Sequence, residues 1–125
     1  MNTLSASLWL RLAALYFLLG VALGIHMGAS GDHALFPVHA HLNLLGWVSM
    51  TLFGLLFRHY PRLGSSRLAW PQFWLYNLGL PVMLFAVAAI YMGHHQFEPL
   101  AGVGSLLVGL AVLLFAINLF RHARD

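Results

Sequence analysis

The sequence contains no cysteine among its 125 residues. Disulfide bonds, iron–sulfur clusters, thiolate zinc sites and C-x-x-C-H haem attachment are therefore excluded. A metal ion in this chain has to be held by histidine, by oxygen or by the sulfur of methionine.

Charged residues are also scarce. They make up 7% of the chain, against about 25% in an average soluble domain, while 61% of the residues are hydrophobic and the mean hydropathy is +0.82. Four apolar stretches reach the length of about 20 residues that a helix needs to cross a bilayer. They span residues 8–28, 36–57, 72–92 and 100–120. We therefore predict an all-α integral membrane protein, a single four-helix transmembrane bundle over residues 1–125.

The six arginines lie near the start of the first stretch, between the second and third, and after the fourth: Arg11, Arg58, Arg62, Arg67, Arg121 and Arg124. In a bundle of alternating helices all six fall at one end. Because cytoplasmic loops carry the excess of basic residues, we expect a multi-pass protein of the inner (plasma) membrane with both termini cytoplasmic. The arginines form no stripe, so the sequence pI near 10.0 does not indicate a nucleic-acid partner.

Six of the eight histidines belong to the opposite end: His26, His33, His39, His41, His94 and His95. A histidine that faces hydrocarbon has no water for its ring nitrogens, so it indicates a functional site. This distribution predicts a metal or haem site in the outer half of the bilayer.

His39 and His41 lie near the start of the second apolar stretch. At about 100° of turn per helical residue, their side chains point about 200° apart, so they cannot easily coordinate the same metal ion. They are able to hold two different centres, one on either side of the helix. The alternative interpretation is a pair of interfacial histidines bonded to lipid headgroups or loop carbonyls.

The string from His39 to Val48 (H-A-H-L-N-L-L-G-W-V), with Gly54 and Pro61 after it, resembles catalytic subunit I of the haem-copper oxidase superfamily. The closest likeness is to its high-affinity bacterial branch and the nitric oxide reductases. The resemblance implies that His39 binds an active-site haem iron and that His41 binds a low-spin haem iron. It implies a non-covalent haem b. The other ring nitrogen of a ligating histidine needs an acceptor, for which Asn43 and the outer-loop carbonyls are both candidates, and Trp47 is a candidate to pack against the porphyrin.

The segment from Gln72 to the pair His94-His95 resembles the family helix whose histidine pair binds the active-site copper. The resemblance therefore implies copper as a further cofactor. A polar loop is the other interpretation of this pair.

The chain also departs from the family pattern. No arginine lies at the histidine end, where family members place arginines near the haem propionates. No Asp, Glu or Lys lies inside an apolar stretch, so no carboxylate relay for protons is visible. We do not expect a proton pump, and whether the chain is a haem-dependent oxidoreductase stays open.

The family's subunit I has twelve helices in three similar sets of four, and this chain has the size of one set. The resemblance therefore implies a homo-oligomer, with a trimer favoured. Gly20, Gly24 and Gly28 repeat every four residues and offer a surface for close helix packing.

Three functions follow from these observations. The first is a haem b protein that exchanges electrons with an unknown donor or binds O2 or NO near the outer leaflet. The second is a copper-binding membrane protein without enzymatic activity. The third is a structural small subunit of a respiratory complex.

Overall fold

The computed structural model describes residues 2–125, and these residues form helices joined by short connections, with no strand. Four helical spans are long and apolar enough to cross a membrane, which confirms the predicted all-α class and a multi-pass membrane protein. The elements are α1 (Ala6–Ser30), α2 (Phe36–His41), η1 (Leu42–Val48), α3 (Ser49–His59), α4 (Arg62–Ser65), α5 (Ala69–Tyr91), η2 (His95–Phe97) and α6 (Glu98–His122). The second span runs continuously through α2, η1 and α3.

α1 and α5 both begin before the apolar stretches from which they were predicted. α1 begins at Ala6 because the Ser5 hydroxyl accepts the backbone N–H of Ser7 at 3.2 Å. It ends at Gly31, whose φ of 73° is the left-handed conformation that glycine adopts at little cost. α5 begins at Ala69, three residues before the predicted start, and Pro71 falls in its first turn, where a missing N–H is harmless.

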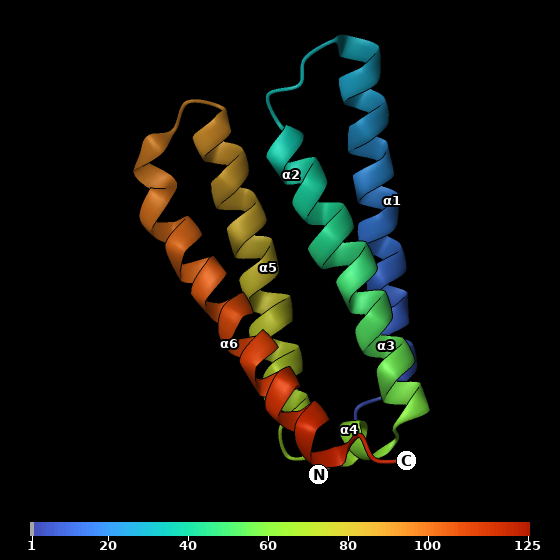
Figure 1. Cartoon of the computed structure of the whole chain (residues 1–125). Coiled ribbons are helices and arrows are strands. Elements are labelled where there is room, and N and C mark those ends of the chain that lie inside the picture. The colour runs from blue at the N-terminus through green and yellow to red at the C-terminus, as the bar shows by residue number, and fades with distance from the viewer. Residues whose placement is uncertain (1) are drawn as a thin grey trace.

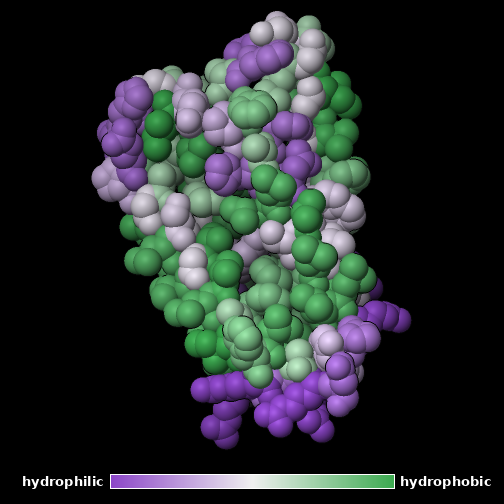
Figure 2. Space-filling model, viewed as in Figure 1, coloured by the Kyte–Doolittle hydropathy of each residue, from purple (hydrophilic) through white to green (hydrophobic). Residues whose placement is uncertain are grey.

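The chain forms two helical hairpins, one from α1 and the second span and one from α5 and α6 (Figure 1). Residues 2–5 and 123–125 lie at the same end, together with α4. All six arginines belong to this end, which we call the arginine end, and the six histidines predicted to lie opposite belong to the other, the histidine end. A hydrophobic belt separates the two hydrophilic ends (Figure 2).

Glycines bring the helices of each hairpin into close contact. A Cβ atom added at Gly46 would lie 2.6 Å from the Tyr16 side chain, and one at Gly104 would lie 2.6 Å from the backbone nitrogen of Met83. Neither position therefore has room for a larger side chain. Each hairpin is held by backbone proximity of the kind that small residues permit in membranes.

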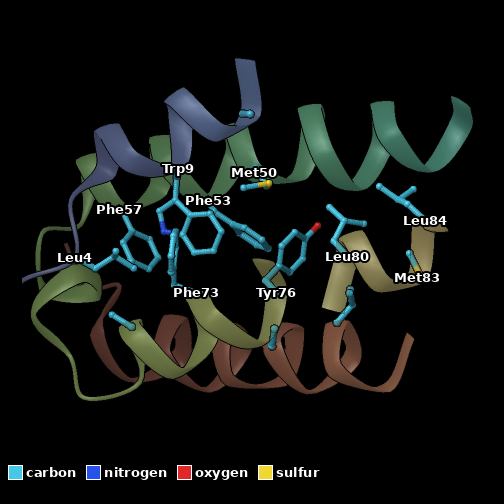
Figure 3. Packing of buried hydrophobic residues seen from close by; sticks show 14 of the residues in the cluster. Leu4, Trp9, Met50, Phe53, Phe57, Phe73, Tyr76, Leu80, Met83 and Leu84 are labelled. Atoms are coloured by element: carbon cyan, nitrogen blue, oxygen red, sulfur yellow. The ribbon is translucent and has the colours of Figure 1, made fainter. Parts of the chain in front are cut away.

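The two hairpins meet through a layer of aromatic rings near the arginine end (Figure 3). Trp9 is fully buried and contacts Phe53 and Phe73 edge to face, with ring centroids 5.1 and 5.2 Å apart. Tyr76 joins the same layer, 5.1 Å from Phe53. Edge-to-face pairs contribute about 0.5–1.5 kcal/mol each beyond the area that they bury, so this layer stabilises the docking of the hairpins.

Candidate functional site

The second span contains a segment of wider π-helical turns, η1, that begins directly after His41 and includes Gly46, Trp47 and Val48. The N–H of Ser49 bonds to the carbonyl of Leu44, five residues earlier, and not to that of Leu45. The Leu45 carbonyl instead accepts the Tyr76 hydroxyl of α5 at 2.6 Å. Single π-helical turns often occur at functional sites, and here the turn adjoins the histidine pair.

The His39 ring is half buried and turned toward α1. Its Nδ1 donates to the carbonyl oxygen of Gly20 at 2.9 Å. A carbonyl only accepts, so this bond requires the proton to be on Nδ1. The Asn43 amide nitrogen lies 3.4 Å from both ring nitrogens and donates to the His39 carbonyl at 3.0 Å. His39 therefore has its polar partners within the chain.

Two glycines of the predicted row make room for these side chains. A Cβ atom at Gly24 would lie 2.9 Å from Cε1 of His39, and one at Gly20 would lie 2.6 Å from Oδ1 of Asn43. At Gly28 a Cβ would meet nothing within 4 Å. The row is therefore a contact surface, as its spacing indicates. Gly20 and Gly24 contact the second span of the same chain. Of the three glycines, only Gly28 has nothing within 4 Å of an added Cβ.

The His41 ring has a different environment. Its Nδ1 donates to the carbonyl of Pro37, four residues earlier in the same helix, at 2.6 Å. This bond also places the proton on Nδ1 and leaves a lone pair on Nε2. The ring lines a shallow hollow of about 220 Å³ together with Ala40, Leu44 and Leu45. Leu44 is 61% exposed, so the hollow opens to the surroundings of the bundle.

The structure brings together only part of the predicted haem site. Asn43 adjoins His39, and the acceptor that holds the His41 ring is the carbonyl of Pro37. Trp47 packs on Phe17 of α1, with ring centroids 4.4 Å apart, and does not line the His41 hollow. Among residues 2–125 no three His, Asp or Glu side chains converge closely enough to hold a metal ion.

His94 and His95 lie exposed on the connection between α5 and α6. His95 Nδ1 is 3.6 Å from a carboxylate oxygen of Glu98, and both side chains face solvent. His94 instead lines an apolar hollow of about 580 Å³ with Met92 and Phe97. The two neighbouring rings thus have different surroundings.

Tyr76 is the residue of this region that the sequence did not single out. A tyrosine in an apolar helix needs an acceptor for its hydroxyl, so its presence in the sequence indicates a buried hydrogen bond. The sequence does not indicate which carbonyl accepts this hydroxyl. The Leu45 carbonyl is available because of the π-helical turn, and no residue pattern in the apolar stretch predicts that turn.

No protein-family model matches the sequence. Comparison with curated proteins and with solved structures gave no match either. The functional argument therefore depends on the geometry and on the resemblance of the histidine motif.

Proposed function

We propose that this protein binds haem b without a covalent bond, in the outer half of the bilayer, and that His41 would hold its iron. The observation that carries the proposal is that the His41 ring lines an open hollow while its Nδ1 is bonded within the chain. Its Nδ1 proton is held by the Pro37 carbonyl, which leaves Nε2 with the lone pair that iron requires. Metal-binding histidines nearly always have such a second partner, which fixes the ring and raises its basicity.

The surroundings of His41 fit an apolar macrocycle. Ala40 is small, Leu44 and Leu45 supply apolar contacts, and this chain holds no cysteine that would compete as a ligand. A bound haem b supplies one-electron chemistry and, where an axial position stays open, a site for O2 or NO. The leucines would keep water from the iron, and the Pro37 carbonyl would hold the ring in place.

The size of the hollow argues for more than one copy of the chain at each site. Ligand pockets usually measure about 300–1,000 Å³, and the His41 hollow measures about 220 Å³. Phe36, Leu44 and Val48 are apolar and exposed along the second span. A neighbouring copy docked there would close the site, and we propose a trimer because the resembling family has twelve helices.

His39 takes a positioning role in this proposal. Its Nδ1 is bonded to Gly20 and its ring lies against Gly24, so it fixes the second span on α1. Its Nε2 lies 3.4 Å from the Asn43 amide nitrogen and the ring packs against Gly24, so ligation by His39 would require the ring or Asn43 to move. We therefore propose one haem per chain, with the arginine end in the cytoplasm according to the positive-inside rule.

Absorption spectroscopy of the purified protein tests the proposal. We expect a Soret band and sharp reduced α and β bands, with loss of most of the haem in His41→Ala. His39→Ala should keep the bands and lower the free energy of unfolding by about 1 kcal/mol, the usual value of one hydrogen bond. His33→Ala, an exposed histidine of the same end, is the control.

Other outcomes would contradict the assignment. Unchanged haem content in His41→Ala would exclude His41 as the ligand, and loss of a second haem in His39→Ala would restore the two-haem arrangement of the resembling family. A colourless protein with stoichiometric copper would favour the copper-binding function. A colourless protein without metal would favour a structural subunit.

A further inference from the structure

The arginine end carries two adjacent hollows that share His122. The first measures about 430 Å³, and Arg62 and Arg124 line it. The second measures about 490 Å³, and Arg67 and Arg121 line it. Each hollow is thus lined by two arginines, and His122 belongs to both linings.

No arginine of these hollows forms an ion pair among residues 2–125. Within residues 2–125 the one ion pair is that of His95 and Glu98, at the histidine end. Asp125 lines the first hollow but forms no ion pair with its arginines, and the second hollow has no acidic residue. Four arginines therefore remain for an anion from outside the chain.

A buried amide fixes the walls of both hollows. Asn118 is fully buried, and its Nδ2 donates to the carbonyl of Leu63 in α4 at 3.0 Å. Its Oδ1 accepts from Nδ1 of His122 at 2.8 Å. The last turn of α6 and the short helix α4 are thereby held together. Both arginine pairs lie on or beside these two elements, so their backbones are positioned before any ligand arrives.

The second hollow also offers a hydroxyl donor. Ser66 accepts the backbone N–H of Leu68 at 3.2 Å through its hydroxyl oxygen. The hydroxyl proton is therefore free to donate to an anion. Arginine forks and hydroxyl donors are the groups that bind phosphate oxygens well.

We propose that the two hollows bind the headgroup of an anionic phospholipid with two phosphates, one phosphate in each hollow. Arg62 and Arg124 contact one phosphate, and Arg67 and Arg121 contact the other. The arginine end forms a hydrophilic cap beyond the hydrophobic belt (Figure 2), and the residues of both hollows belong to this end. Phe120 is 89% exposed next to Arg121, where an acyl chain would pass. Basic pockets between membrane helices are known to take such headgroups.

Native mass spectrometry of the full chain, released from phosphatidylcholine nanodiscs that contain cardiolipin, tests the proposal. We expect cardiolipin to remain bound and phosphatidylglycerol, with one phosphate, to bind more weakly. Each arginine near an anionic headgroup contributes about 1 kcal/mol, so Arg62→Gln with Arg124→Gln should weaken cardiolipin binding about thirtyfold. Arg67→Gln with Arg121→Gln should have the same effect.

The matched control removes the same charge outside the hollows. Arg11 and Arg58 are exposed residues of the same end that line neither hollow. Arg11→Gln with Arg58→Gln should therefore leave the affinity within about twofold of the original protein. An equal loss of cardiolipin affinity in the control would show that only the overall surface charge matters, and it would overturn the proposal.

Three further outcomes separate a lipid site from its alternatives. Phosphatidylglycerol bound as tightly as cardiolipin would contradict the two-phosphate arrangement. Displacement of the lipid by millimolar inorganic pyrophosphate would identify a site for free phosphate. Asp125→Asn removes the acidic side chain of the first hollow, so it should strengthen cardiolipin binding. Misfolding cannot produce such a gain. Unchanged binding would contradict the placement of a phosphate in this hollow.

Discussion

His39 and His41 are separated by one residue, yet their rings depend on different parts of the molecule. His39 donates across to the Gly20 carbonyl of α1, whereas His41 donates to the Pro37 carbonyl of its own helix. The first bond joins two helices and the second only orients a side chain. A substitution at His39 is therefore expected to change stability, and one at His41 is expected to change ligand binding.

Gly24 is predicted to be essential for the His39 contact. In Gly24→Ala the new Cβ would lie 2.9 Å from the His39 ring, which the bond to Gly20 holds in place. We expect a loss of about 1–3 kcal/mol in the free energy of unfolding, the usual cost of overpacking. Thermal unfolding in detergent, followed by circular dichroism, measures it.

Gly28→Ala is the matched control for this substitution. The position is on the same helix and has nothing within 4 Å of the added atom. Alanine is favoured over glycine inside a helix by about 1 kcal/mol, so this variant should be neutral or more stable. An equal loss of stability in both variants would contradict a specific contact between Gly24 and the His39 ring.

At the scale of elements, the wider turn of η1 ties the two hairpins together. Because Ser49 bonds to the Leu44 carbonyl, the Leu45 carbonyl is available to the Tyr76 hydroxyl. This bond crosses from the second span to α5 inside the aromatic layer. The segment that follows the histidine pair is therefore also a connection between the hairpins.

Tyr76→Phe removes this connection without changing the packing of the ring. The Leu45 carbonyl would lose its side-chain partner inside the bundle, so we expect a loss of about 1–3 kcal/mol in the free energy of unfolding. Tyr91→Phe, at a 55% exposed ring near the end of α5, should change the stability little. Equal effects in the two variants would contradict a structural role of the Tyr76 hydroxyl.

The elements divide clearly into those that the sequence predicts and those that it does not. The four spans follow from hydropathy, because bilayer thickness dictates their length. The wider turn of η1 does not, because the sequence from Leu42 to Val48 also suits an ordinary apolar helix. The hydroxyl that bonds to the Leu45 carbonyl belongs to Tyr76, 31 residues away. The glycine spacing predicted a close contact, but only the folded chain identifies its partners as His39 and Asn43.

At the scale of the whole molecule, the core is narrow and much of the apolar surface faces outward. Buried apolar residues gather between the hairpins, while Leu18, Ile25, Leu106 and other large side chains are more than half exposed. Such a surface suits contact with lipid. It also leaves the face of His41 available to a neighbouring copy.

We predict a homotrimer in a mild detergent, measured by native mass spectrometry. The His41 hollow is too small to enclose a ligand in one chain, so haem should be found with the oligomer. Replacing Leu44 by glutamine on the exposed edge of the hollow should favour monomers and reduce haem content together. A monomer that keeps its haem would contradict a shared site, and a dimer would contradict the trimer only.

The backbone of residues 2–5 has a consequence for the order in which the molecule is completed. Leu4 donates to the Gly64 carbonyl at 2.9 Å, and Trp70 donates to the Asn2 carbonyl at 2.6 Å. During synthesis Leu4 and Asn2 emerge 60 and 68 positions before their partners. Each hairpin carries its own close glycine contacts, so α1 and the second span are able to pair before α5 exists. Residues 2–5 are then able to dock once residues 64–70 have emerged, which joins the first hairpin to the connection that leads into α5.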